Sequence, residues 1–315
     1  MISFRYHIVS IVSVFLALAV GVALGGGPLK GEVDNTLVEQ VEADRKAKAD
    51  LQAEISALRS TNAFTDAFAK TVAPSLLGQG LADRPVTLMV LPGADESVVT
   101  EVSDLIGVAG GSVAGTVRVG EGLVDAGNKQ LVDELASQLL DGTPDVSVAD
   151  DASGYERMGA LIARAVATDE DGGAAVDDAA NSILSGLSTA NLMSAQGEFT
   201  RRGSLVLFVA GETSGKADRS GAGTIVSSLA GAIDADSDGV VVAGPVSSAR
   251  AGGAVEAVRT NVATAKDVST VDALFRAAGQ VVTVMALSEQ AAGEAGHYGA
   301  VDAADGAMPG AVPAD

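Results

Sequence analysis

The chain has 315 residues, and its 20 Lys and Arg against 41 Asp and Glu give a formal net charge of −21. It contains no cysteine, which excludes disulfides, cysteine nucleophiles and thiolate metal sites. The negative charge argues against nucleic-acid binding, because phosphate neutralisation needs clustered Lys and Arg. The length is sufficient for one large or two modest domains with a hydrophobic core.

An apolar segment near the N-terminus, residues 8–24, predicts a membrane-spanning helix of about 25 Å. Arg5 and His7 precede it, so the positive-inside rule predicts a cytoplasmic N-terminus and an extracytoplasmic remainder. The alternative is a cleaved signal peptide, for which Ala17–Ala19 offers a cleavage pattern. We therefore expect residues 1–30 to form a cytoplasmic tip and a plasma-membrane anchor in the lipid bilayer. The anchor residues are Ile8, Val12, Phe15, Leu16, Leu18, Val20 and Leu24.

Residues 31–73 are predicted to form a coiled-coil stalk. The segment from Glu32 to Lys70 is charged, rich in Ala, Gln and Glu, and free of Pro and internal Gly. Apolar residues recur at heptad spacing, which is typical of a parallel homodimer, and a polar Asn can fix its register. The expected interface residues are Leu37, Val41, Leu51, Ile55, Leu58 and Asn62, interrupted by polar Asp44 and Lys48. The alternatives are a solvated stalk helix or one packed on its own domain. Pro74 is expected to end the helix.

Residues 74–298 predict an extracytoplasmic α/β domain with a mostly parallel sheet flanked by helices, because short apolar runs alternate with amphipathic segments. The expected strands are residues 86–91, 113–119, 205–210, 240–243 and 268–271. The expected helices are residues 96–108, 128–140, 155–167, 176–194, 223–233, 253–259 and 275–292. Residues 299–315 hold little to bury and are expected to be a disordered tail.

No catalytic, cofactor-binding or metal-ligating residue is predicted, and we expect that the protein is not an enzyme. Gly221-Ala222-Gly223 matches a nucleotide-binding loop only weakly. Asp234–Gly239 has the first carboxylates and the glycine of a calcium loop, but Pro245 stands where the bidentate Glu belongs, so an acidic turn is favoured. His297 is the one histidine outside the anchor, and no nucleophile elbow accompanies it.

Several motifs resemble one family. The start, Ile2–Ser10 followed by Phe15–Gly21, resembles the actinobacterial copper-transport protein B family, also called MctB or SteB. Further segments are similar to that family too: Val240–Pro245, Val268–Asp272, Ala286–Gln290 and Gly296–Gly299. The resemblance implies either copper efflux through the outer envelope or an accessory role in cell separation. In the second version the protein works with a membrane partner called SteA, upstream of peptidoglycan hydrolases.

The residues favour the second version. The predicted strands are short, continuous apolar runs, whereas the strands of a porin alternate apolar and polar residues. The six methionines are scattered along the chain rather than clustered as copper ligands. The predicted function is therefore a membrane-anchored, dimeric scaffold or regulator of the cell envelope with a SteA-like partner. The alternative is copper transport or copper homeostasis. A third hypothesis is a small-ligand or enzymatic domain that uses the strand ends near Gly211 and Gly244.

Overall fold

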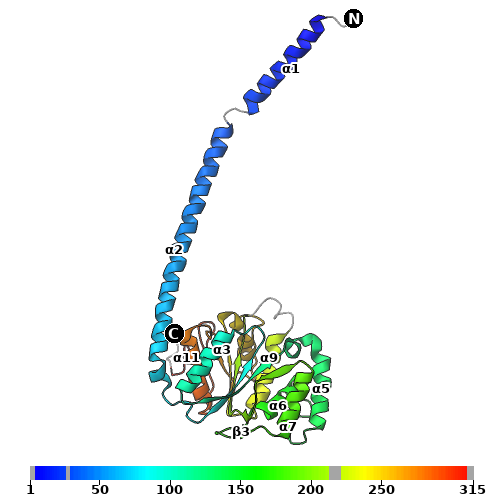
Figure 1. Cartoon of the computed structure of the whole chain (residues 1–315), viewed down its shortest axis with the longest axis vertical. Coiled ribbons are helices and arrows are strands. Elements are labelled where there is room, and N and C mark those ends of the chain that lie inside the picture. The colour runs from blue at the N-terminus through cyan, green and yellow to red at the C-terminus, as the bar shows by residue number, and fades with distance from the viewer. Residues whose placement is uncertain (1–3, 26–28, 213–220, 311–315) are drawn as a thin grey trace. The chain divides into compact units, whose positions relative to one another are not determined.

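The computed structural model describes residues 4–25, 29–212 and 221–310, with side chains from residue 5 and, after the first gap, from Leu37 (Figure 1). The chain divides into two compact units, residues 1–64 and residues 65–315. Helix α1 spans Phe4–Gly25 and belongs to the first unit. Helix α2 spans Leu29–Leu77 and continues from the first unit into the second.

The α/β unit begins at residue 65, ahead of the predicted boundary at residue 74. Ala73 and Leu77, in the last turns of α2, are buried in its core. Pro74 lies inside the helix rather than at its end, because a proline near the terminus removes a single backbone hydrogen bond and Leu77 gains burial. Asp66 forms an ion pair with Arg276 at 2.9 Å, which fixes these turns on the domain.

The α/β unit is built on a seven-stranded sheet with the order β4-β2-β1-β6-β7-β8-β9, which confirms the predicted fold class. All neighbouring strands are parallel except β2 and β4. The strands are β1 (Pro85–Val90), β2 (Ser112–Val119), β4 (Met193–Gln196), β6 (Leu205–Val209), β7 (Val240–Ala243), β8 (Ser269–Val271) and β9 (His297–Tyr298). Strands β3 (Ala174–Ala175) and β5 (Arg201–Arg202) form a separate pair.

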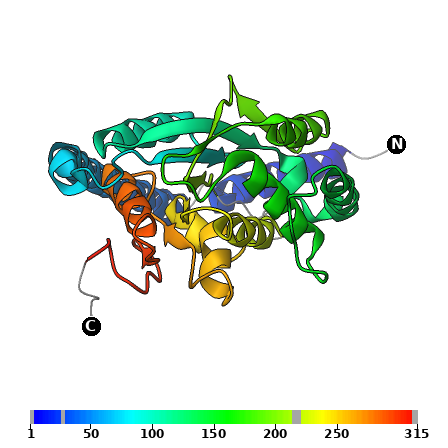
Figure 2. The ribbon, with the colours of Figure 1, turned by 90° about the horizontal axis from the view of Figure 1, so that it is seen from below.

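Helices cover both faces of the sheet (Figure 2). Successive side chains of a strand point to opposite faces, so Leu205 and Leu207 of β6 join one core while Val206 and Phe208 join the other. The first face carries α3 (Glu96–Val108), α11 (Ala277–Gln290) and the end of α2. The second carries α5 (Lys129–Asp141), α6 (Gly154–Val166), α7 (Asp178–Thr189), α9 (Ala222–Asp234) and α10 (Ala254–Thr260). Short helices α4 (Glu121–Val124), η1 (Ala126–Asn128) and η2 (Val246–Ala249) lie in the connections.

Polar side chains set several helix starts. Asp95 caps α3 by accepting the Ser97 backbone N–H at 2.8 Å, and Asp177 caps α7. The predicted helix over residues 176–194 was wrong at its C-terminal end. Asn191 takes a left-handed φ of 55°, after which β4 pairs with β2. Pairing with a sheet edge therefore overrode the helical pattern.

Residues 299–310 differ from the expected disordered tail, because they form turns against the domain. Asp272 is fully buried and accepts the backbone N–H groups of Ala300 and Val301 at 2.6 and 3.0 Å. Arg259 binds Asp272 and also donates to the Tyr298 carbonyl at 2.8 Å. Backbone groups of residues 298–301 thus form hydrogen bonds with a buried ion pair. The low apolar content of this segment gave no indication of such contacts. Residues 311–315 lie outside the described residues.

Candidate functional site

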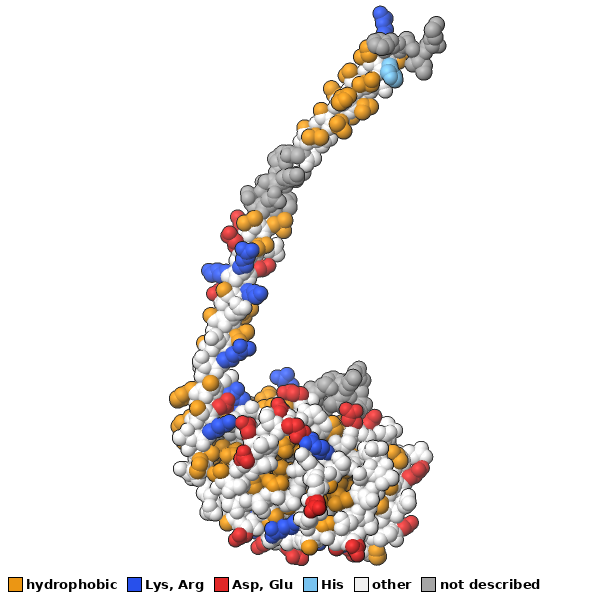
Figure 3. All heavy atoms as spheres, in the orientation of Figure 1, with side chains coloured by type: hydrophobic (Ala, Val, Ile, Leu, Met, Phe, Trp, Pro, Cys, Tyr) orange, Lys and Arg blue, Asp and Glu red, His pale blue; other side chains and the backbone are white. Residues whose placement is uncertain are grey.

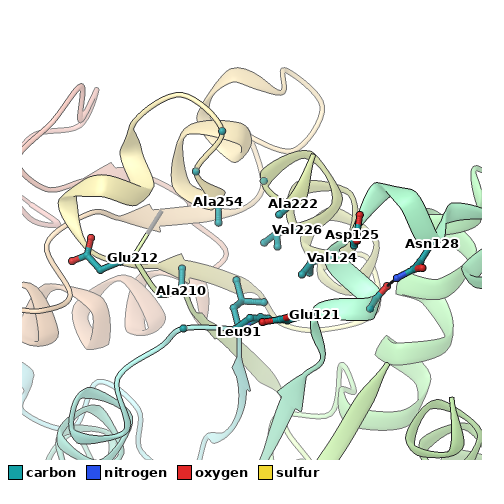
Figure 4. A pocket seen from close by; sticks show the side chains of 17 residues that line it. Leu91, Glu121, Val124, Asp125, Asn128, Ala210, Glu212, Ala222, Val226 and Ala254 are labelled. Atoms are coloured by element: carbon teal, nitrogen blue, oxygen red, sulfur yellow. Dashed lines mark hydrogen bonds between the residues drawn. The ribbon is translucent and has the colours of Figure 1, made fainter. Parts of the chain in front are cut away.

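A cleft with a volume of about 660 Å³ lies at the carboxyl ends of β1 and β6 (Figure 4). After β1 the chain turns to α3 on one face, and after β6 it leads to α9 on the other face. The sheet therefore reverses its winding between these two strands, at the position where open α/β sheets place ligands. We call this site the switch-point cleft. Its lining comprises Leu91, Pro92, Gly93, Glu121, Gly122, Val124, Asp125, Asn128, Ala210, Gly211, Glu212, Ala222, Gly223, Val226, Gly252, Gly253 and Ala254.

Glycines bring the walls of the switch-point cleft close together. A Cβ on Gly211 would lie 2.3 Å from the carbonyl carbon of Gly93, so the loops after β6 and β1 touch through bare backbone. A Cβ on Gly223 would lie 2.7 Å from the carbonyl oxygen of Gly253. Both positions require glycine for close backbone approach. Of the two strand ends named in the third hypothesis, the one at Gly211 lines the cleft, whereas Gly244 is not among the described lining residues.

Three carboxylates surround the switch-point cleft: Glu121, Asp125 and Glu212. Asp125 accepts the backbone N–H of Gly127 at 2.8 Å, and Glu212 accepts the hydroxyl of Ser247. Sequence reasoning missed Glu121 and Asp125. The sequence shows only that these two residues follow the strand at residues 113–119. Whether they lie near the end of β6 depends on the order of strands in the sheet.

Helix α9 begins at the switch-point cleft. Gly221 precedes it in the left-handed conformation, with φ of 68°, and supplies no side-chain cap. Ala222 and Gly223 of the first turn line the cleft. The first N–H groups of a helix lack intrahelical partners and carry partial positive charge. The predicted helix start at the Gly-Ala-Gly motif is thus confirmed. The similarity of this motif to a nucleotide-binding loop stays weak.

The other candidates from the sequence, His297 and the acidic turn Asp234–Gly239, lie in separate places along the chain. The nitrogen Nδ1 of His297, in strand β9, lies 3.0 Å from the Thr270 hydroxyl, and burial lowers the pKa of this histidine. Asp234–Gly239 forms the turn between α9 and β7, as expected. Burial, together with nearby Asp267, raises the pKa of Asp234 to about 6. Among the described residues, no group of three or more His, Cys, Asp and Glu is arranged to hold a metal ion.

Helix α1 carries the predicted anchor residues. Its segment Arg5–Gly25 has a mean hydropathy of 2.6 and is the one helix, among the described residues, long and apolar enough to cross a membrane. Figure 3 shows hydrophobic side chains along this helix. The anchor residues are all exposed: Ile8, Val12, Phe15, Leu16, Leu18, Val20 and Leu24. A signal sequence passes the same test of length and composition.

The predicted coiled-coil residues lie on helix α2. The five apolar ones, Leu37, Val41, Leu51, Ile55 and Leu58, are between 46% and 57% exposed. Asn62 is exposed as well. Their heptad spacing places them along one side of the helix, which we call the α2 seam. The homodimer stays a prediction.

Comparisons with known proteins agree with the resemblance seen in the sequence. The family described as "Copper transport outer membrane protein, MctB" matches residues 1–309. The "Copper transporter MctB" of Mycobacterium tuberculosis (strain H37Rv) is 29% identical over 314 residues, covering 95% of this chain and 96% of the relative. Its namesake in Mycobacterium leprae is 28% identical over 327 residues, covering 99% and 100%. The chain therefore belongs to the MctB family.

Proposed function

We propose that this protein acts in copper homeostasis of the cell envelope as a membrane-anchored protein. The observation that carries the proposal is the family match over residues 1–309. The relatives named copper transporters also align with this chain over nearly their whole length. The apolar helix α1 supports membrane anchoring. The positive-inside rule supports a cytoplasmic N-terminus and an extracytoplasmic α/β unit, because Arg5 and His7 precede the apolar segment.

We further propose that copper moves through a partner transporter rather than through this chain. Copper(I) prefers thiolate and clustered thioether ligands. The sequence has no cysteine. Met89 of β1, Met158 of α6 and Met193 of β4 are buried in one hydrophobic core cluster, where packing against apolar neighbours accounts for them.

A deletion strain tests this proposal. Loss of the gene in its native host is expected to change cell-associated copper, measured by mass spectrometry, and growth in copper-supplemented medium. The full chain should restore both, and so should a Met158→Leu/Met193→Leu variant. Unchanged copper content in the deletion strain would contradict the proposal. Stoichiometric, submicromolar copper binding by the purified full chain would instead establish direct handling and overturn the partner route.

A second candidate is the dimeric scaffold or regulator of cell separation, with a SteA-like partner upstream of peptidoglycan hydrolases. The exposed α2 seam favours it, because apolar heptad positions are stabilised when a second helix covers them. A parallel dimer would bury the seam of both copies. Such a stalk would present two α/β units to one partner and raise the affinity through avidity.

Lysine substitutions on the α2 seam test the dimer. Leu51→Lys/Ile55→Lys/Leu58→Lys should convert a dimer into a monomer in multi-angle light scattering of the full chain in detergent. The control Ala49→Lys/Ala53→Lys/Ala57→Lys adds the same charge at exposed positions outside the seam and should stay dimeric. If the seam variant and the wild type had the same mass, the α2 seam would not form a dimer, and the proposal of a dimeric scaffold would be contradicted.

Crosslinking in the native membrane separates the two functions. Recovery of a division protein or a cell-wall hydrolase with the wild type, and its loss with the seam variant, would support the scaffold. Recovery of a metal-transporting ATPase would support the copper function.

A further inference from the structure

We propose that the C-terminal segment, residues 297–310, is released from the sheet when the ring of His297 takes up a proton. His297 and Tyr298 form β9, the last strand of the sheet, which pairs with β8. The chain then turns back, because the Asp305 carboxylate accepts the His297 backbone N–H at 2.8 Å and the Asp305 N–H donates to the His297 carbonyl at 3.1 Å. The inference needs neither copper nor a dimer, so it is tested separately from the proposed function.

A chain of hydrogen bonds sets the protonation state of His297. The hydroxyl of Thr270, on β8, is fully buried and accepts the Nε hydrogen of Arg259 at 2.9 Å. The same oxygen lies 3.0 Å from Nδ1 of His297. Arginine can only donate, so the hydrogen of the hydroxyl is directed to Nδ1, which must be unprotonated to accept it. The folded chain is therefore matched to the neutral imidazole with its proton on Nε2.

A protonated ring would disturb this arrangement in two ways. Its Nδ1–H would compete with Arg259 for the Thr270 oxygen, and the hydrogen of the buried hydroxyl would lose its acceptor. The imidazolium would also bring a second positive charge to the oxygen that already binds the guanidinium. In agreement with this geometry, burial and the charge of Arg259 lower the pKa of His297 below its ordinary value of 6.5.

The other groups around the ring do not reverse this preference. The Asp305 carboxylate and the Ala265 backbone act in the opposite direction, but the pKa of the histidine stays lowered. The carboxylate of Asp272 is held by its arginine partner and by two backbone N–H groups. Lys266 and Asp267 form an exposed ion pair with each other at 3.3 Å.

Arg259 connects the ring to the rest of the C-terminal segment. It donates to the carbonyls of Tyr298 and Val301 and pairs with the buried Asp272 carboxylate. A proton on His297 therefore acts on the residue that holds the segment in place. The released ring binds a proton more tightly than the docked ring, so docking is strongest above pH 6.5 and weakens as the pH falls from 6.5 toward the lowered pKa. Release leaves β8 as the exposed edge of the sheet.

Hydrogen exchange of the full chain in detergent, followed by mass spectrometry, tests the proposal. After correction for the intrinsic exchange rate, protection of residues 297–301 should fall severalfold between about pH 7.5 and about pH 5, because proton uptake enlarges the released population. Protection of the core strand β6, residues 205–209, should fall much less. An equal loss in both strands would show that acid destabilises the whole unit, and it would overturn the proposal.

Two glutamine variants assign the effect to one ring. His297→Gln retains an acceptor for the Thr270 hydroxyl and takes up no proton, so protection of residues 297–301 should lose its severalfold fall over this interval. The matched control His7→Gln removes the other histidine of the sequence and should keep the full pH dependence. A loss of protection in His297→Gln as large as that in the wild type would overturn the proposal.

Titration of the ring is a measurement that does not require His297→Gln to fold. In the His7→Gln variant, His297 is the only histidine of the sequence, so its ring signals in NMR spectra are unambiguous. Its pKa in the folded chain should lie below its pKa in the same chain unfolded in urea. An equal or higher pKa in the folded chain would contradict the release mechanism.

Discussion

Substitution of Arg259 by Met tests the role of the buried ion pair that holds the C-terminal segment. The Arg259 side chain is 9% exposed and that of Asp272 is fully buried, with 3.0 Å between their charged groups. Arg259 also donates from Nε to the Thr270 hydroxyl at 2.9 Å and to the carbonyls of Tyr298 and Val301. Methionine preserves much of the side-chain volume and removes all of these donors.

The substitution leaves the Asp272 carboxylate buried with backbone donors but no counter-charge. Breaking a buried pair by removing one partner costs about 3–5 kcal/mol, because the remaining charge stays desolvated. For a unit of this size the cost corresponds to a fall in Tm of about 6–20 °C. Urea unfolding of the full chain, followed by circular dichroism, measures the free energy. Hydrogen exchange at Ala300 and Val301, whose N–H groups bind Asp272, should accelerate.

Arg118→Met is the matched control, because Arg118 pairs with Glu96 where the side chains are 37% and 63% exposed. Exposed pairs contribute little to stability because solvent screens them, so the control should unfold almost like the wild type. A loss below about 1 kcal/mol for Arg259→Met would refute the reasoning. Unchanged exchange at Ala300 and Val301 would show that the C-terminal segment is held by other contacts.

Two carboxyl groups predict opposite pH dependences. Burial and nearby Asp267 raise the pKa of Asp234 from 3.8 to about 6, so native stability should fall as the pH rises through that interval. Asp234→Asn should then stabilise the protein by about 1–2 kcal/mol at neutral pH in urea titrations, and an unchanged pH slope would contradict this. The Arg164 hydrogen bond and the Ala180 backbone N–H lower the pKa of Asp177 to about 2, so its stabilisation is present above 3.8 and disappears toward pH 2. Asp177→Ala should cost about 1–2 kcal/mol at pH 7 and little at pH 2; equal costs at both would count against the pair.

The regular elements of the α/β unit could be predicted because their signals are local. The apolar run at residues 240–243 and the amphipathic pattern at residues 96–108 coincide with β7 and α3. Strand β4 was missed, since Met193–Gln196 is polar on its exposed side and gains its conformation from pairing with β2. Strand β9 was missed for the same reason: two residues beside β8 carry no periodicity.

The candidate site could be predicted only in part. The glycine that follows β6 pointed to a strand end, because a parallel sheet offers that edge to ligands. Glu121 could not be linked to it, since about ninety residues separate the two in the chain. Their meeting depends on the order β2-β1-β6, which no local pattern encodes.

Composition and hydrophobic pattern were enough to establish an apolar N-terminal helix, a heptad-patterned helix and an acidic α/β unit, because burial follows short-range periodicity. The family could likewise be identified from short motifs. Tertiary structure was needed for the strand order, the switch-point cleft and the docking of residues 299–310. The last of these rests on Arg259 and Asp272. Each of these features joins backbone or charged groups that are distant in sequence, and their hydrogen bonds form only after the sheet has brought them together.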